Sequence, residues 1–241
     1  MESQFKYRKR MDAIFKNVRS RGYKFLMEHE SKEVLKIYTI PTTRERLAVD
    51  ANDAIKSANT IGYPVVLKIC SPRIVHKSDI GGVIIGIHTP KEVKEAYRKI
   101  IKNMNAKAPE AKILGILVQE EVPKGFEVIV GAVRDPQFGP VVMFGLGGVF
   151  VEVLKDVSFR LAPLTKNEAL NMIKETKGFK ILEGLRGEKP ADLNALTSVI
   201  TKVGEIITDL PEVMEIDINP LIVFDKGLVA VDARIVINDR L

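Results

Sequence analysis

The sequence of 241 residues predicts a mixed α+β protein with two lobes. In the first half, short β-rich runs alternate with helical patterns. The second half closes with strands joined by short turns, which favours antiparallel pairing over a doubly wound parallel sheet. Near the midpoint, a polar segment with proline and glycine separates two β-rich runs and predicts a hinge. We therefore expect a polar leader and helix in residues 1–30, a first lobe in 31–119 and a second lobe in 120–241.

The elements of the first half follow from caps and periodicity. Apolar residues at rough helical spacing predict an N-terminal helix, and Ser31 is expected to cap a short helix that ends near Ile37, before an extended segment at 38–40. Asp50 is expected to begin a helix that Gly62 ends. The remaining predictions are strands at 65–69, 83–87 and 113–119 and a helix that starts at Thr89-Pro90.

The second half is predicted from the same signals. Leucine, isoleucine and valine at helical spacing predict two helices, and alternating or continuous apolar runs predict strands. The turn signal Asp225-Lys226-Gly227 joins two of these strands as a hairpin. The predicted elements are strands at 126–133, 140–144 and 149–153, helices at 168–175 and 192–209, and strands at 213–218, 221–224 and 228–231.

Composition excludes several classes of protein. Hydrophobic residues make up 46% of the chain, yet no run of about 18 uncharged apolar residues occurs, so we expect no membrane contact and a cytoplasmic protein. The one cysteine, Cys70, excludes an internal disulfide and a cysteine cluster for zinc, and we expect it to pack at a strand end. The net charge is +6, and the basic residues are interspersed with 31 acidic ones. This pattern favours attraction of anionic substrates over nucleic-acid binding.

The most informative segment runs from residue 65 to 83. Lys68 interrupts an apolar strand, and His76, Lys77 and Asp79 follow in a polar loop. Taken singly, a strand-end lysine that reaches solvent and a loop histidine without a function are the better explanations. Together they favour phosphate chemistry, because a neutral imidazole nitrogen can attack phosphorus while a carboxylate orients the ring and a lysine stabilises the phosphate.

Glycines at 145, 147 and 148 are a second candidate for phosphate binding. The chain has no G-x-x-x-x-G-K-[ST] motif, and these glycines lack both the spacing and the following helix of a dinucleotide-binding fingerprint. Backbone amides at Gly147 and Gly148 could approach a phosphate, although spacing alone favours an ordinary tight turn.

Oxygen-bearing side chains alternate along a predicted strand near the C-terminal end of the sequence. Glu215, Asp217 and Asn219 share one face because side chains alternate along a strand, and Asp232 ends the return strand of the hairpin. Oxygen ligands are what Mg²⁺ prefers. A solvated polar face is the alternative, but the flanking isoleucines and Pro220 imply a buried neighbourhood in which unpaired carboxylates are unfavourable.

Five motifs, in order over most of the chain, resemble one family. It is the ATP-grasp β subunit of ADP-forming acetyl-CoA synthetases, acyl-CoA ligases found in archaea, and the chain is more distantly similar to the β subunit of succinyl-CoA synthetase. The motifs are Val66-Leu67-Lys68, His76-Lys77-Ser78-Asp79 with Gly81-Gly82-Val83, the run from Gly125 to Gly131, the run from Phe144 to Val149, and the run from Glu215 to Leu221.

The resemblance implies an ATP-grasp fold of two α+β lobes that hold ATP or ADP between them. It implies that His76 accepts a phosphoryl group and passes it to ADP, with Lys77 and Asp79 beside it. It also implies that Asn219 and Asp232 hold Mg²⁺. The nucleotide contacts that it implies are Lys68, Gln119, Glu120, Glu121, Val122, Glu127, Gly147, Gly148 and Asp217.

The resemblance also implies a partner. In this family, a CoA-binding α subunit carries a second phosphorylated histidine, and an α2β2 heterotetramer converts acetyl-CoA, ADP and phosphate to acetate, CoA and ATP. A subunit for another acid (succinate, or a branched or aromatic acid) and a regulatory ATP-grasp module are the alternatives. The acyl group, the choice between adenine and guanine, the direction of the reaction, and the roles of Glu152, Asp156 and Arg160 stay open.

Overall fold

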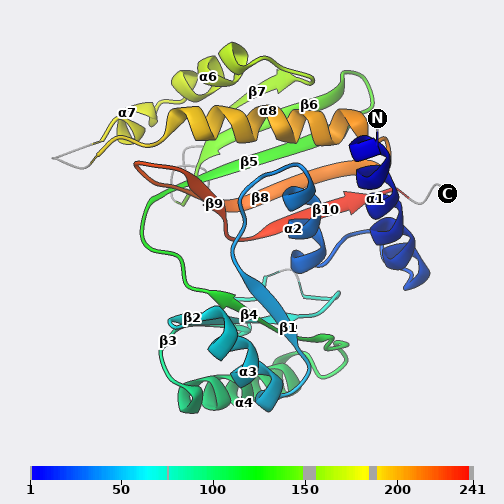
Figure 1. The fold of residues 1–241 in the computed structure, drawn as a ribbon, viewed down its shortest axis with the longest axis vertical. Coiled ribbons are helices and arrows are strands. Elements are labelled where there is room, and N and C mark those ends of the chain that lie inside the picture. Colours follow the sequence, from blue (N-terminus) through cyan, green and yellow to red (C-terminus); the bar gives the residue numbers. More distant parts are fainter. Residues whose placement is uncertain (1, 75, 149–155, 185–188, 239–241) are drawn as a thin grey trace. The chain divides into compact units, whose positions relative to one another are not determined.

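The structure, a computed structural model, describes residues 2–74, 76–148, 156–184 and 189–238 and forms two compact units (Figure 1). The smaller unit is Thr43–Pro123. The larger unit combines the chain up to Thr42 with the chain from Lys124 onward. This division differs from the expected one, because residues 31–42 belong with the second half of the chain and residues 120–123 with the smaller unit.

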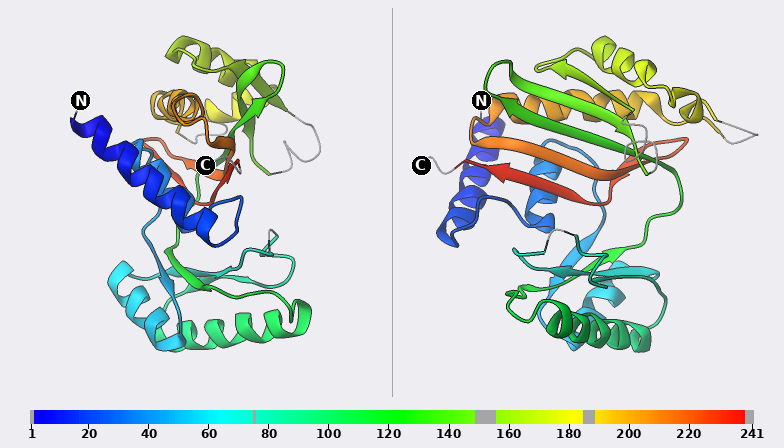
Figure 2. Two further views of the ribbon diagram at one scale, coloured as in Figure 1. Left: turned by 90° about the vertical axis from the view of Figure 1, so that its right-hand side faces the viewer. Right: turned by 180° about the vertical axis from the view of Figure 1, so that it is seen from behind.

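The smaller unit is a four-stranded antiparallel sheet with both of its helices on one face (Figure 2). The strand order is β1-β4-β2-β3. Asp50 caps the first helix by accepting the N–H groups of Asn52 and Asp53, and Thr89 caps the second, as expected. The elements are β1 (Glu45–Ala48), α3 (Ala51–Ile61), β2 (Val65–Cys70), β3 (Val83–Ile87), α4 (Pro90–Lys107) and β4 (Gly115–Glu120).

The larger unit is an antiparallel sheet of order β10-β8-β5-β6-β7, with β9 paired to β8. Helix α8 runs along one face of this sheet and α2 packs against β10, so that face and the helices share one apolar core (Figure 1). The helices are α1 (Glu2–Ser20), α2 (Glu28–Ile37), α6 (Lys166–Glu175), α7 (Phe179–Leu182) and α8 (Leu193–Asp209). The strands are β5 (Phe126–Asp135), β6 (Gly139–Leu146), β7 (Val157–Leu161), β8 (Val213–Val223), β9 (Leu228–Ala230) and β10 (Ala233–Ile237).

Ser31 does not cap α2, as the sequence had suggested. The helix begins three residues earlier, and Ser31 instead accepts the backbone N–H of Ile235 at 3.1 Å, within β10. Further along, the N–H of Ala230 donates to the carbonyl of Pro41, and Thr39 has a left-handed φ of 58° in a turn rather than an extended conformation. These contacts explain why residues 31–42 belong to the larger unit.

The C-terminal strands also differ from the prediction. The strands predicted at 213–218 and 221–224 form one strand, β8, which ends at Val223. The carbonyl of Pro220 still accepts the N–H of Val231, so the ladder continues past the proline. The expected strand at 228–231 is shorter, and β10 follows it. Elements without a strong local signal went unpredicted (β1, β7, α7 and β10), and the predicted strand at 149–153 lies outside the described residues.

Two expectations from composition can be compared with the structure. Cys70 is 6% exposed at the end of β2, which confirms that it packs there. Within the described ranges, none of the helices has both the length and the apolar character needed to cross a membrane.

Candidate functional site

The predicted site residues divide between the two units, and each group is described within its own unit. In the smaller unit, Lys68 lies on β2, the strand between β3 and β4. Its strand neighbours Leu67 and Ile69 face the core with α3 and α4, so Lys68 points to the opposite face. On that face it lies beside Gln119 of β4, because β4 pairs Leu117 with Lys68 and Gln119 with Val66.

Both residues are buried, which is unusual for polar and charged side chains. Lys68 is 6% exposed and Gln119 is 1% exposed. This finding excludes the alternative in which Lys68 is a strand-end lysine that reaches solvent. A buried ammonium is stable only with anionic or hydrogen-bonding groups around it, which is the chemistry of a phosphate contact or of a structural network.

His76 precedes a closed turn. The N–H of Gly82 donates to the carbonyl of Lys77 at 2.8 Å, and the N–H of Gly81 donates to the carbonyl of Ser78 at 2.9 Å. This pair of nested bonds, with Gly81 at φ +69°, has the form of a Schellman motif. The turn therefore has a defined backbone, while the His76 side chain is exposed.

Helix α4 anchors this turn. Asn103 donates from Nδ2 to the carbonyl of Gly81 at 3.0 Å, and Lys107 donates from Nζ to the carbonyl of Asp79 at 3.3 Å. A Cβ at Gly81 would lie 2.5 Å from Asn103 Nδ2, so a larger residue there would displace the Asn103 side chain and would also have to adopt the left-handed φ. Sequence reasoning missed both anchors, because nothing local links a residue in α4 to a glycine 22 positions earlier.

Asp79 does not orient His76 in this conformation. Its side chain is exposed, and over the described ranges no hydrogen bond joins its carboxylate to the imidazole. The backbone of Asp79, rather than its carboxylate, makes the contact with Lys107. The structure thus presents His76 to solvent without the carboxylate partner that the sequence suggested.

The carboxylates of the predicted hinge have local partners. Glu120 accepts the backbone N–H of Arg44 at 2.7 Å and its Nε at 2.6 Å, and Glu121 accepts the backbone N–H of Gly86 at 2.7 Å. These contacts fix the segment to the smaller unit. Both carboxylates therefore have partners within the smaller unit.

In the larger unit, the glycine segment packs on β5. The N–H of Gly147 donates to the carbonyl of Glu127 at 2.7 Å, and a Cβ at Gly147 would lie 2.9 Å from Glu127 Cβ. Gly148 has φ +63°. Glu127 is exposed, and it points away from the core that its neighbour Val128 enters. The structure therefore brings Glu127 and Gly147 together.

The predicted oxygen cluster forms on the face of the larger sheet opposite the apolar core. Ile216 and Ile218 face the core, so Glu215, Asp217 and Asn219 lie on the opposite face. The N–H of Asn219 donates to the carbonyl of Asp232 at 3.2 Å, which places these two residues opposite each other. The alternation read from the sequence is confirmed.

The charges in this cluster repel one another. Burial raises the pKa of the Asp217 carboxyl, and the nearby Glu215 and Asp232 carboxylates raise it further, while Arg234, directly across on β10, lowers it. Arg234 is a member of the cluster that sequence reasoning did not identify. A divalent cation would relieve this repulsion.

The donor set fits Mg²⁺. In the described part of the chain, no three His, Cys, Asp or Glu side chains form a metal site on their own. Mg²⁺ is commonly held by one or two carboxylates together with phosphate oxygens and water, so the amide oxygen of Asn219 and the carboxylate of Asp232 are a suitable pair.

Two residues of uncertain role have structural contacts. Asp156 is buried and accepts the N–H groups of Lys177 and Gly178, both at 2.8 Å, ahead of α7. Arg160 pairs with Glu175 of α6. These contacts favour a structural role for Asp156 and Arg160 over phosphate binding, and Glu152 lies outside the described residues.

Two α+β units, each built on an antiparallel sheet, are typical of an ATP-grasp protein. The family model described as an ATP-grasp domain matches residues 17–237, so the chain belongs to that family. Within it, the chain belongs with the β subunits of ADP-forming acetate–CoA ligases. It is 53% identical over 212 residues to subunit beta of the ADP-forming acetate–CoA ligase I of Pyrococcus furiosus, a match that covers 88% of this chain and 91% of that one.

Two further relatives extend the comparison. The ADP-forming acetate–CoA ligase I of Archaeoglobus fulgidus is 48% identical over 88% of this chain, which spans only 31% of that longer protein. The solved acetyl-coenzyme A synthetase 1 of Ca. Korarchaeum cryptofilum, in complex with coenzyme A and Ca-AMPCP, superposes with a TM-score of 0.92 at 49% identity, covering 94% of this chain and 99% of that one. Another structure of that protein holds Mg-AMPPCP, with a phosphohistidine segment pointing towards the nucleotide binding site (TM-score 0.84, 46% identity, same coverage).

Proposed function

We propose that this chain is the nucleotide-binding β subunit of an ADP-forming acetyl-CoA synthetase, and that His76 relays a phosphoryl group to ADP. The observation that carries the proposal is the exposed imidazole of His76 ahead of a hydrogen-bonded turn, in a chain that belongs with the β subunits of such ligases. An exposed histidine on a defined backbone is suited to accept a group from a second protein.

The reaction divides between two chains. On the partner, phosphate displaces CoA from acetyl-CoA to give acetyl phosphate, and a partner histidine takes the phosphoryl group and releases acetate. The His76 nitrogen then attacks that phosphorus and frees the partner histidine. Finally, a β-phosphate oxygen of ADP attacks phospho-His76, which gives ATP and restores the imidazole.

The other site residues have supporting roles. Lys68 would contact nucleotide phosphates, together with the amides of Gly147 and Gly148, and Lys77 would neutralise charge on the transferred group. Gln119, Glu120, Glu121, Val122, Glu127 and Asp217 would line the nucleotide site. Asn219 and Asp232 would hold Mg²⁺, which when bound neutralises the charge that spreads over the phosphate oxygens.

A separate CoA-binding subunit follows from the relay, and we expect an α2β2 assembly in the cytoplasm of an archaeon. The single-chain relative supports the need for a further part, because a protein about three times as long contains the matching region as one part. A β subunit for succinate or for a branched or aromatic acid is the second candidate, since acid selection would lie on the partner.

Reconstitution tests the proposal. The chain is mixed with the candidate CoA-binding subunit of the same organism, acetyl-CoA, ADP, phosphate and Mg²⁺, and ATP is followed by luminescence. We expect ATP only when both chains are present. Parallel reactions with succinyl-CoA or phenylacetyl-CoA, and with GDP, identify the acid and the base. If the chain binds ATP but [γ-³²P]ATP leaves no acid-labile label on it, the regulatory-module alternative is correct instead.

A further inference from the structure

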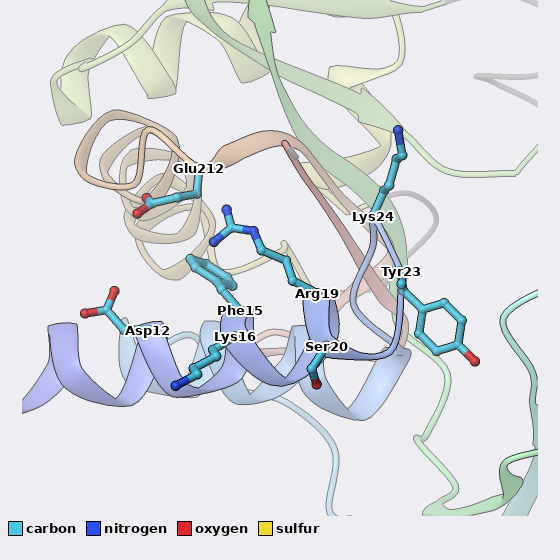
Figure 3. A pocket seen from close by; sticks show the side chains of 9 residues that line it. Asp12, Phe15, Lys16, Arg19, Ser20, Tyr23, Lys24 and Glu212 are labelled. Atoms are coloured by element: carbon cyan, nitrogen blue, oxygen red, sulfur yellow. The ribbon is translucent and has the colours of Figure 1, made fainter. Parts of the chain in front are cut away.

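A cavity lies within the larger unit, beside α1. It has a volume of about 680 Å³, a size typical of small-molecule sites. Helix α1, the loop that follows it, and Glu212 just before β8 line it (Figure 3). Tyr23 supplies apolar surface, Phe15 lies beneath in the core at 1% exposure, and Lys16, Arg19 and Lys24 supply positive charge.

The cavity has an excess of positive charge. Its two acids, Asp12 and Glu212, are both ion-paired with a single residue, Arg8. With Arg8 included, and with Lys24 left out of the count because it has an interaction of its own, three cationic side chains face two carboxylates, which leaves a net charge of +1. The sequence shows the same bias, because residues 1–24 contain eight Lys or Arg and two acids and so account for the whole net charge of +6.

Arg19 has unused hydrogen-bonding capacity. Its Nε is buried without a hydrogen-bond partner among the described residues, and its Nη2 makes only long contacts with Asn238, at 3.3 and 3.4 Å. In Figure 3 its guanidinium points toward Glu212, whose Oε2 is likewise buried without a partner. A buried charged donor without an acceptor is unfavourable, and an anionic ligand would supply the acceptor.

We propose that this cavity binds a small organic anion, a carboxylate or phosphate ester with an apolar body, whose charged group bonds Arg19 and whose body lies against Tyr23. The cavity is separate from the Mg²⁺ residues of the same unit. Glu212 and Asn219 are seven residues apart along extended chain, a span of about 23 Å.

The cavity also lies partly beyond the region that defines the family. Asp12, Phe15 and Lys16 precede residue 17, where the match to the family model begins. An occupant would brace α1 against the ends of β8 and β10, through Glu212 and Asn238. The site is therefore suited to a regulatory ligand particular to chains with this helix.

Calorimetry on the full chain, with saturating Mg-ADP present, tests the proposal. The probes are phenyl phosphate and benzoate, which separate the two kinds of anion, and benzylamine, which has the same ring and the opposite charge. We expect one or both anions to bind and benzylamine not to bind. Arg19→Gln should weaken binding about tenfold or more and Lys16→Gln by about threefold, whereas Lys9→Gln, an exposed lysine of α1 outside the cavity lining, should change it less than about twofold.

Several outcomes would overturn the proposal. They are the absence of binding by both anions at millimolar concentration, equal binding of benzylamine, or equal losses in the Arg19 and Lys9 variants. The Lys16 variant keeps the test valid if Arg19→Gln does not fold. A parallel titration without Mg-ADP completes the test, because anions that bind only in the absence of the nucleotide would lie in the nucleotide site, which would also reject the proposal.

Discussion

The turn after His76 and the oxygen cluster of β8 and Asp232 have different physical properties. The turn has a fixed backbone and an exposed side chain, because its hydrogen bonds run between backbone groups and to α4. The oxygen cluster is fixed by a strand ladder, and its carboxylates repel one another. The first region suits a group that must react with a second protein, and the second suits a group that must hold a cation. Changes in the turn side chain should therefore affect turnover, whereas changes in the cluster should affect binding and charge balance.

The largest expected effect is that of His76→Asn. Loss of the nucleophile should lower ATP formation by at least about 10³-fold, while the free energy of unfolding changes by less than about 0.5 kcal/mol because the side chain is exposed. Luminescence and urea titration measure the two quantities. His88→Asn, an exposed histidine of the same unit, is the matched control and should keep full activity. Full turnover in the His76 variant would show that His76 does not carry the phosphoryl group.

Asp232→Asn should have the next largest effect. Loss of one carboxylate ligand should weaken Mg-ADP binding about 10- to 100-fold, with a smaller effect on ADP without Mg²⁺. Calorimetry with and without Mg²⁺ measures the difference. Asp225→Asn removes the same charge from a hairpin turn where the carboxylate pairs with Lys189, and it should leave binding unchanged. Equal affinities for wild type and Asp232→Asn would show that the cluster holds no metal.

Gly81→Ala tests how far the turn depends on its backbone. Gly81 and Gly86 have nearly the same φ, +69° and +68°, but only at Gly81 would a Cβ meet another residue, Asn103. Alanine at either position should cost about 1 kcal/mol for the left-handed backbone, and Gly81→Ala should cost about 1 kcal/mol more for the contact. Thermal unfolding measures both. Combining Gly81→Ala with Asn103→Ala should recover part of the extra loss, and equal losses at the two glycines would show that α4 does not press on the turn.

The sequence predicted what is encoded locally. Helices α3 and α4 were placed by side-chain caps at Asp50 and Thr89, and the oxygen face of β8 followed from strand alternation. Ser31 was misread as a cap because its partner, Ile235, lies 204 residues away. Asn103 was missed for the same physical reason, since a helix residue that anchors a distant turn leaves no local pattern.

The smallest expected effect is that of Asp217→Asn, which tests whether the carboxylates of the oxygen cluster repel one another. The pKa of Asp217 is raised in the folded state, first by burial and then by Glu215 and Asp232, so the folded protein binds more protons than the unfolded chain just above the ordinary carboxyl pKa of 3.8. Stability from this group is thus present below that pH and is lost as pH rises through the raised pKa.

Asparagine removes both the titration and the repulsion. Without Mg²⁺ at pH 7, the variant should therefore be more stable than wild type, by about 0.5 kcal/mol on the scale of cross-strand charge pairs, and Tm should rise by about 1–2 °C. At pH 3, where the wild-type carboxyl is also neutral, the two proteins should unfold alike. Saturating Mg-ADP at pH 7 should narrow or reverse the difference, because the cation then neutralises the carboxylates that repel in its absence. A variant less stable than wild type at pH 7 without Mg²⁺ would instead mean that Asp217 is held by its attraction to Arg234, which lies across the ladder on β10.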